Sequence, residues 1–275
     1  MAELETITYD ESDGVATVTL NRPEVHNAFN EQMQRELRAV WTGLAVNDDV
    51  RCAILTGAGD KAFCTGIDRA EAMGDGSEPV DPVTGKMIGY RDPFNFDDPG
   101  DWLGPKANGL WKPVIAAVNG MACGGAFYML GEVEFIIAAD HATFFDPHVT
   151  FGMTAAFEPV QLLHKMPFQE IMRMSLLGGS ERLSASRARE VGLVSEVVAG
   201  ADLAATARWA ALEIAAAPML ATMGTVRALW TGLELSRRQA LDLMYLYTNV
   251  GNDPDSLAEG QRRFTSGTRV EWRLR

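Results

Sequence analysis

The sequence predicts an α/β fold, in which a largely parallel β-sheet with helical crossovers is followed by an all-helical region. Three short segments, residues 50–56, 114–119 and 134–139, are nearly all apolar and alternate with stretches of helical periodicity. Strands of a parallel sheet have this composition because helices bury both of their faces. From about Pro159 onward the apolar spacing is helical throughout. We therefore expect an α/β core over residues 1–200 and a C-terminal helical region over residues 201–275.

The first elements are predicted to be a hairpin and a helix. Residues 6–10 and 15–20 alternate apolar and polar side chains on either side of Asp13-Gly14, a pattern typical of two paired strands and a turn. Asn27 is then the expected N-cap of a helix that ends at residues 47–49. The apolar residues that give this helix its spacing are Met33, Leu37, Val40, Trp41 and Leu44.

Residues 73–108 are rich in Gly, Pro and Asp and are too long for a simple connector, so we expect a lid or pocket wall there. Four aromatic residues in and beside this segment indicate either a roomy apolar acyl pocket or packing within the lid: Phe94, Phe96, Trp102 and Trp111. Later helices are predicted at residues 159–177, 184–191, 201–216, 218–233, 236–247 and 254–266. The Ala-rich residues 203–217 are expected to serve packing, and the amphipathic helices to contact a neighbouring subunit.

The composition excludes several classes of partner. The 275 residues contain 24 Lys and Arg against 37 Asp and Glu, a formal net charge of −13, which argues against binding nucleic acid. The N-terminus has no basic region before an apolar stretch, and no apolar run is long enough to cross a bilayer. We therefore expect a cytoplasmic protein with no membrane partner. Glu132 and Glu134, which interrupt the most apolar tract, are expected at a solvated helix end or in subunit salt bridges.

The cysteines and histidines indicate neither disulfides nor a metal site. The 3 cysteines have no paired spacing and lie among apolar neighbours, as reduced core thiols do. The 4 histidines are not spaced as metal ligands near an acidic residue, so no metal is expected.

Two glycine turns each follow a predicted buried strand and begin a helix. They lie around Gly66, in residues 63–68, and around Gly124-Gly125, in residues 119–126. Glycine permits a positive φ and close backbone approach, so that amide N–H groups can point into a cleft. Two such turns facing each other would form an oxyanion hole for a carbonyl that gains negative charge. Either turn alone is equally compatible with tight packing of a strand on a helix.

Three ordered motifs resemble those of the enoyl-CoA hydratase/isomerase, or crotonase, superfamily. Residues 20–28 are similar to its N-terminal signature, residues 61–68 to its first oxyanion segment, and residues 112–120 to the approach to its second. The resemblance covers most of the chain. It implies an α/β, crotonase-like spiral of ββα units with a C-terminal helical trimerisation region. It also implies homotrimers or dimers of trimers, an acyl-CoA thioester as substrate, and no separate cofactor.

The resemblance also implies roles for individual residues. The backbone amides of Ile67 and Gly125 would hold the thioester carbonyl. Coenzyme A would be bound by Arg22, Ala28, Lys61 and Gly66, with the two cations near the nucleotide phosphates or adenine.

The chain departs from this family at the proton-handling positions. Hydratases of the superfamily carry two glutamates that share a water, whereas the corresponding positions here hold Tyr128 and His148. His148 can accept and donate a proton near neutral pH, and Tyr128 can donate a hydrogen bond but is too weak an acid to replace a carboxylate base. Glu158 lies in residues 153–159, which replace the turn that is usual in this family. Glu158 is expected either to orient His148 or to act as the base, and Asp146 is the weaker candidate for these roles. Plain packing is the alternative role for Tyr128 and His148.

The sequence thus favours an acyl-CoA enzyme that stabilises a thioester enolate, with hydration of an enoyl-CoA as the leading activity. Isomerisation needs only one base, and hydrolysis of a thioester or of a carbon–carbon bond could use a water activated by His148. A homologue that binds coenzyme A without turnover is the alternative from another class.

Overall fold

The computed structural model describes residues 4–73, 90–92, 95–96, 98–267 and 272–275. Its central feature is a six-stranded sheet with the strand order β1-β2-β3-β7-β9-β12. β1 pairs with β2 in antiparallel fashion, and the remaining pairs are parallel. The strands are β1 (Ile7–Ser12), β2 (Val15–Leu20), β3 (Cys52–Gly57), β7 (Val114–Val118), β9 (Phe135–Ala139) and β12 (Glu196–Val198). The predicted hairpin and parallel sheet are confirmed.

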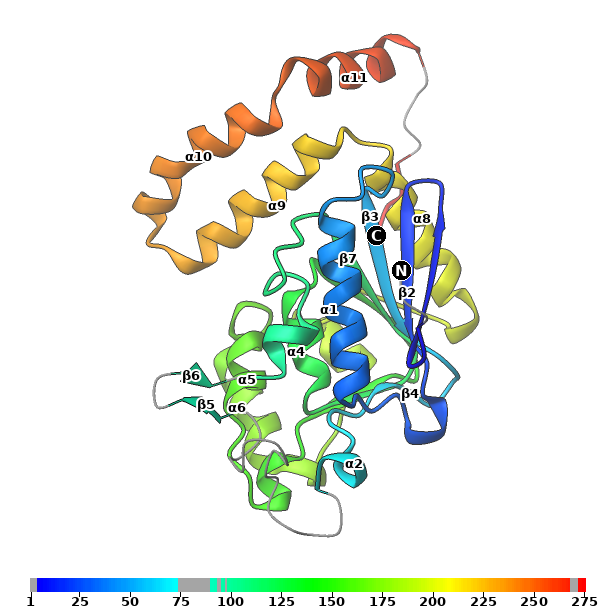
Figure 1. The fold of residues 1–275 in the computed structure, drawn as a ribbon, viewed down its shortest axis with the longest axis vertical. Helices are drawn as coiled ribbons and strands as arrows, with labels where there is room; N and C mark the ends of the chain where they lie inside the picture. The colour runs from blue at the N-terminus through cyan, green and yellow to red at the C-terminus, as the bar shows by residue number, and fades with distance from the viewer. Residues whose placement is uncertain (1–3, 74–89, 93–94, 97, 268–271) are drawn as a thin grey trace.

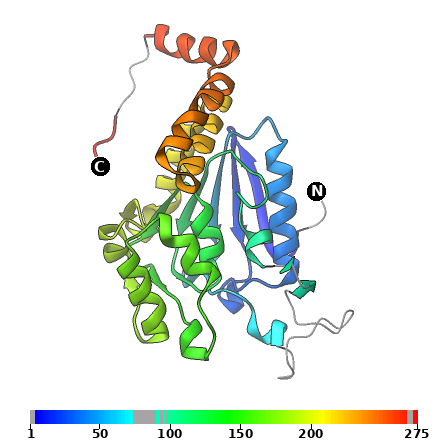
Figure 2. The same ribbon diagram turned by 90° about the vertical axis from the view of Figure 1, so that its left-hand side faces the viewer.

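Helices bury both faces of this sheet. Helix α1 (Glu31–Ala45) covers one face and α8 (Leu203–Ala215) the other (Figures 1 and 2). Successive strand residues point to opposite faces, so Leu55 packs in the cluster that contains α1 and Ile54 in the cluster that contains α8. The alanines of α8 that face the sheet recur every four residues and allow close approach, as expected: Ala207, Ala211 and Ala215.

A second sheet of very short strands has the order β11-β10-β8-β4. Its strands are β4 (Ala62–Cys64), β8 (Met121–Cys123), β10 (Thr143–Phe145) and β11 (Leu183–Ser184). β4, β8 and β10 each directly follow a strand of the large sheet, which gives the repeated ββα unit that the resemblance implied. Periodicity missed these strands because three residues are too few to establish a period.

Helix α1 begins later than predicted. Its N-cap is Asn30, whose side chain accepts from the amide of Met33. Asn27 is fully buried with a φ of 56°, and its side-chain amide donates to the carbonyls of Ala58 and Ala62. Asn27 therefore ties two loops together and does not cap the helix.

The helical part of the chain starts with three pieces where one helix was predicted over residues 159–177. They are α5 (Phe157–Gln161), a 3-10 turn (Leu162–His164) and α6 (Phe168–Leu177). Pro167 lies at the break because proline cannot continue a helix through its own position. The later helices agree closely with the predictions: α7 (Ala185–Glu190), α8, α9 (Met219–Glu234), α10 (Arg237–Gly251) and α11 (Pro254–Thr265). Only α10 is longer than the predicted helix over residues 236–247.

Helices α9 and α10 form an antiparallel pair that extends away from the α/β core (Figure 1). Glycines allow the close approach, since a Cβ on Gly224 would lie 3.2 Å from the carbonyl oxygen of Tyr247. Large apolar side chains on α10 remain exposed: Leu241, Leu243, Tyr245, Leu246 and Val250.

Much of the predicted lid, including Phe94 and the side chain of Phe96, lies outside the described residues. Its described elements are α2 (Arg69–Met73), β5 (Tyr90–Asp92), β6 (Asn95–Phe96) and α3 (Gly100–Leu103). The predicted acyl-pocket role of the two tryptophans stays a prediction, and the structure gives their packing partners. Trp102 stacks under Arg38 at 4.3 Å and Trp111 under Arg227 at 3.7 Å, so both pack against helices.

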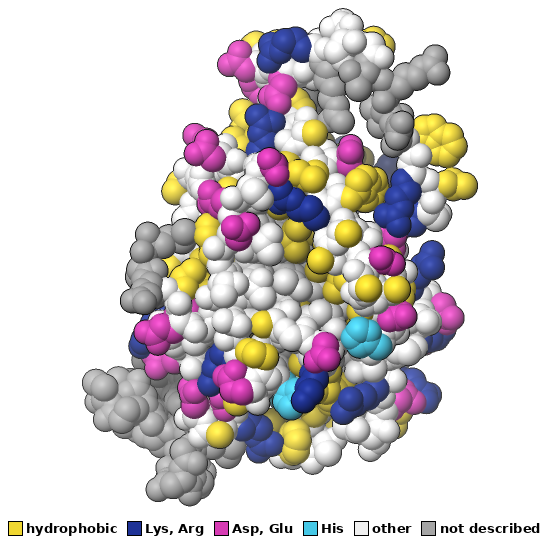
Figure 3. All heavy atoms as spheres, turned by 90° about the vertical axis from the view of Figure 1, so that its right-hand side faces the viewer, with side chains coloured by type: hydrophobic (Ala, Val, Ile, Leu, Met, Phe, Trp, Pro, Cys, Tyr) yellow, Lys and Arg dark blue, Asp and Glu magenta, His cyan; other side chains and the backbone are white. Residues whose placement is uncertain are grey.

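The three cysteines are buried thiols, as predicted. Glu132 and Glu134 are not solvated: Glu132 accepts from the amides of Lys106 and Ala107, and Glu134 pairs with Lys106. Among the described residues, no single helix has the length and apolarity to cross a membrane. On the face in Figure 3, acidic and basic side chains are interspersed, without a broad basic field.

Candidate active site

The two glycine turns meet in space. Gly66 has a φ of +85°, and a Cβ built on it would lie 3.0 Å from the amide nitrogen of Gly125. A Cβ on Gly125 would lie 2.5 Å from Cε1 of Phe29 and 3.4 Å from Cα of Gly66. Both positions therefore require glycine, because any larger residue would separate the two turns.

Local hydrogen bonds fix these turns while leaving two amides unused. The amide of Phe29 donates to the carbonyl of Gly66 at 2.9 Å, and the amide of Asp68 donates to the carbonyl of Phe29 at 2.8 Å. Gly125 directly precedes helix α4 (Ala126–Glu132), and the amide of Gly124 donates to Phe145 at 3.3 Å. Within the described residues, the amides of Ile67 and Gly125 donate to no backbone or side-chain acceptor.

His148 lies beside the second turn, in the 3-10 turn His148–Phe151 that follows β10. A Cβ on Gly124 would be 3.7 Å from Cε1 of the His148 ring. The Nδ1 atom of His148 lies 2.5 Å from Oδ1 of Asp146, a carboxylate with no exposed surface. The other oxygen, Oδ2 of Asp146, has no hydrogen-bond partner in the described structure. Asp146 therefore acts chiefly on His148, and the hydrogen bond that the imidazole donates to this carboxylate raises the pKa of His148.

Glu158 lies on the opposite side of the imidazole. Its Oε1 is 3.3 Å from Nε2 of His148, and the residue is 5% exposed. It reaches this position because α5 packs tightly against α4, where a Cβ on Gly131 would lie 2.5 Å from that of Gln161. Burial raises the pKa of Glu158, and the positive charge of His148 opposes that rise.

Tyr128 is buried on α4 behind Glu158, three residues after Gly125. Its hydroxyl donates to Oδ2 of Asp98 at 3.0 Å. Burial, together with the negative charges of Glu158 and Asp98, raises the pKa of Tyr128 far above the neutral range. Tyr128 is therefore a permanent hydrogen-bond donor and cannot serve as a base.

These contacts bring all three predicted proton-handling residues, Tyr128, His148 and Glu158, into one cluster. Asp146 favours the charged imidazole, whereas burial favours the neutral carboxyl of Glu158. Such a pair can hold a single shared proton between Nε2 of His148 and the carboxyl of Glu158. It therefore offers one acid and one base at adjacent atoms.

The residues expected to bind coenzyme A differ in their surroundings. The guanidinium of Arg22 has protein partners: it donates to the carbonyl of Ala28 at 2.8 Å and pairs with Asp68 at 2.9 Å and Glu71 at 2.6 Å. Lys61 is exposed and forms no ion pair among the described residues. Ala28 is buried, so it can offer its backbone but almost no side-chain surface.

The sequence reasoning underestimated Asp146 and missed Asp98. Each precedes a proline, and each carboxylate accepts from the amide two residues on: Asp146 from His148 at 3.2 Å and Asp98 from Gly100 at 2.8 Å. An Asp-Pro pair that forms such a turn fixes the direction of its own carboxylate. That local pattern was the available signal for both residues.

No group of three or more His, Cys, Asp or Glu side chains suited to hold a metal ion occurs within the described ranges. The arrangement instead combines two amides that have no acceptor among the described residues with a histidine–glutamate pair that can share a proton. Its chemistry is that of a carbonyl that gains negative charge while a neighbouring atom gains or loses a proton.

The chain is similar to known proteins over almost its whole length. Residues 10–273 match the family model for enoyl-CoA hydratase/isomerase. The chain is 33% identical over 258 residues to an (E)-benzylidenesuccinyl-CoA hydratase from Thauera aromatica, covering 94% of this chain and 95% of that protein. It is 33% identical over 254 residues to a 1,2-epoxyphenylacetyl-CoA isomerase from Escherichia coli, covering 91% and 92%.

A solved structure of an enoyl-CoA hydratase/isomerase from Mycobacterium paratuberculosis superimposes with a TM-score of 0.81 at 34% identity, covering 98% of this chain and 99% of that one. The predicted spiral of ββα units is the fold of these proteins. The chain belongs to the enoyl-CoA hydratase/isomerase family.

Proposed function

We propose that this protein is a hydro-lyase that adds water across the double bond of an enoyl-CoA thioester. The observation that carries the proposal is the convergence of the turns at Gly66 and Gly125 beside the His148–Glu158 pair. Relatives named as hydratases support the same reaction.

In this proposal the amides of Ile67 and Gly125 donate to the thioester oxygen. That oxygen gains negative charge when water attacks the β-carbon and the double-bond electrons move toward the carbonyl. A preorganised donor of this kind contributes about 3–4 kcal/mol to lowering the barrier. The bridge between Phe29 and Ile67 holds the first donor in place.

The His148–Glu158 pair would supply both proton transfers. Glu158 takes a proton from water as its oxygen bonds to the β-carbon, and His148 gives its Nε2 proton to the α-carbon. The pair starts with one proton, gains one and loses one, so it returns to its initial state. Asp146 supports this step because it raises the pKa of His148 and so keeps the imidazole charged.

Coenzyme A would lie along the first turn, past Ala28 and toward Lys61. Lys61 is the better candidate for a phosphate contact, since its ammonium has no ion-pair partner in the described chain. Arg22 would act mainly as a positioning residue, because its contacts with Ala28 and Asp68 hold the segment that carries Ile67.

The exposed apolar side chains of α10 support a homotrimer or a dimer of trimers, in which these helices contact neighbouring subunits. The free, buried thiols are typical of a reducing compartment, and we propose the cytoplasm. Size-exclusion chromatography with light scattering measures the oligomer directly.

The decisive experiment is Gly66→Ala, measured as the loss of enoyl absorbance of crotonyl-CoA. The added methyl group would lie 3.0 Å from the Gly125 amide, so we expect hydration to fall at least about a hundredfold. Gly43→Ala is the matched control. A Cβ there meets nothing within 4 Å, and alanine favours the helix, so activity should be unchanged.

Other outcomes would identify the competing functions. Release of free coenzyme A would indicate a hydrolase, and movement of a double bond without uptake of water would indicate an isomerase. Binding of several acyl-CoA thioesters without turnover of any would make the protein a binding homologue and refute the proposal.

A further inference from the structure

A cavity lies at the opposite end of the strands that lead to the candidate active site. It has a volume of about 730 Å³ and lies between α9 and the first residues of β7 and β9, next to Pro113 and Phe135. The glycine turn at Gly125 follows the other end of β7. Cavities that bind small molecules have volumes of roughly 300–1,000 Å³, so this one has the size of a ligand site.

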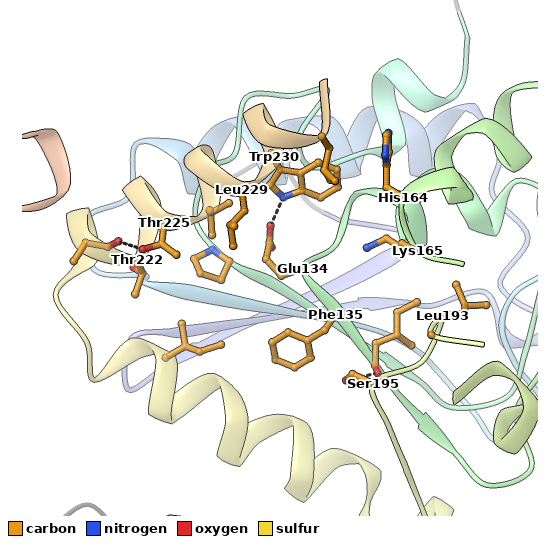
Figure 4. A pocket seen from close by; sticks show the side chains of 17 residues that line it. Glu134, Phe135, His164, Lys165, Leu193, Ser195, Thr222, Thr225, Leu229 and Trp230 are labelled. Carbon is orange, nitrogen blue, oxygen red and sulfur yellow. Dashed lines mark hydrogen bonds between the residues drawn. The ribbon is translucent and has the colours of Figure 1, made fainter. Parts of the chain in front are cut away.

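Its wall is mainly apolar. Helix α9 contributes Val226 and Leu229, and the core contributes Phe135 and Leu193. Figure 4 shows Leu229, Phe135 and Leu193 around the cavity. The hydroxyls of Thr222 and Thr225 are bonded to carbonyls of their own helix, so they add little polarity. The cavity therefore suits a hydrocarbon or aromatic group.

Three ionisable side chains line the cavity: Glu134, His164 and Lys165 (Figure 4). Glu134 and Lys165 differ in their hydrogen bonding. The carboxylate of Glu134 accepts from Nε1 of Trp230 at 2.9 Å, from Nζ of Lys106 at 2.9 Å and from the amide of Val114 at 2.5 Å. The carboxylate of Glu134 thus has its hydrogen-bond donors within the protein, and its charge is balanced by that of Lys106.

Lys165 has no carboxylate of its own. Its Nζ donates to the carbonyl of Val133 at 2.6 Å and lies 5.6 Å from the ring of Trp230. An ammonium group has three N–H donors, and this carbonyl is its one acceptor among the described residues. Burial lowers the pKa of Lys165 to about 8. Glu134 is paired with Lys106, so the ammonium of Lys165 faces apolar surface without an ion-pair partner among the described residues.

We propose that this cavity binds an apolar monocarboxylic acid, with the carboxylate on Nζ of Lys165 and the apolar part against Phe135, Val226 and Leu229. A single carboxylate would complete the hydrogen bonds of the ammonium and neutralise its charge. The site is separate from the acyl-CoA site and needs none of its residues.

The test is calorimetric titration of the full-length protein with octanoate and, as the uncharged probe, 1-octanol. We expect one octanoate per chain, and at least about tenfold weaker binding after Lys165→Met, which keeps the length of the side chain but removes the charge. Thr225→Phe, which narrows the cavity, should also weaken octanoate binding. Arg238→Met removes an exposed cation of α10 and should change nothing.

The proposal is overturned if octanoate binds equally well to Lys165→Met and Thr225→Phe as to the unchanged protein, because it would then occupy another site, such as the proposed acyl-CoA site. It is also overturned if the unchanged protein does not bind octanoate, as would happen if a second copy of the chain filled the cavity. Binding of 1-octanol as tight as that of octanoate would exclude recognition of the carboxylate. None of these outcomes depends on the proposed hydratase activity.

Discussion

Two buried glutamates, Glu36 and Glu158, are each 5% exposed, yet they have opposite properties. Burial alone would raise the pKa of Glu36, but four donors reverse this and lower it: the hydroxyl and amide of Thr6, the amide of Glu5 and the side chain of Gln32. Glu158 has fewer stabilising donors, so burial dominates and raises its pKa although the charge of His148 opposes that rise. The number of hydrogen-bond donors, and not exposure, separates a carboxylate that anchors the fold from one that can exchange a proton.

Replacing His148, which shares the proton with Glu158, should have the largest effect on turnover. We expect His148→Gln to lower turnover of crotonyl-CoA about a thousandfold while KM changes little, because general acid catalysis is lost and the oxyanion donors remain. Steady-state kinetics with a binding measurement for crotonyl-CoA checks this. Turnover within a factor of two of the unchanged protein would remove His148 from the mechanism.

The same substitution at the two glutamates tests the comparison itself. Glu158→Gln should lower turnover at least about a hundredfold and change the free energy of unfolding by less than about 1 kcal/mol, since a poorly solvated carboxylate is removed. Glu36→Gln should leave turnover unchanged and lower the free energy of unfolding by about 1–3 kcal/mol, since donors lose a charged acceptor. Turnover and urea unfolding of both variants are the measurements.

Acid titration sharpens this contrast. The pKa of Glu36 is lowered in the folded protein, so its stabilisation is fully present above its unfolded pKa near 4.5 and is lost as pH falls through the folded value. The stability difference between the unchanged protein and Glu36→Gln should therefore shrink below about pH 4.5. A difference that stays constant down to pH 3 would show that Glu36 acts through packing alone.

A smaller effect is expected from Asp146→Asn. Loss of this carboxylate lowers the pKa of His148, so the charged imidazole disappears at lower pH and the basic limb of the rate profile moves to lower pH. We expect about a tenfold loss of turnover at neutral pH. A pH–rate profile measures this shift, and a loss of activity with an unmoved basic limb would contradict it.

The smallest effect should come from Tyr128→Phe. The hydroxyl of Tyr128 is a fixed donor behind Glu158 and takes no part as a base, so turnover should fall only about two- to fivefold. The free energy of unfolding should fall by about 1 kcal/mol, because Asp98 loses one donor. A loss as large as that of Glu158→Gln would make Tyr128 a proton-transfer group.

Much of the fold and part of the site could be predicted from the sequence. The apolar runs of β3, β7 and β9 and the turns at Gly66 and Gly125 are local patterns, and both are present in the structure. The second sheet was missed because its strands are too short to show a period. The cap of α1 was misplaced because Asn27 is held by carbonyls more than thirty residues away.

The sequence by itself determined the first hairpin, the buried strands β3, β7 and β9, most of the later helices, the positions that must be glycine, and the types of side chain available for proton transfer. Only the tertiary structure decided what those side chains can do. Tyr128 meets Asp98 across 30 residues, and Glu36 meets Thr6 across 30. A pKa depends on burial and on the donors and charges within a few ångströms, and the folded chain draws these from segments that are distant in sequence.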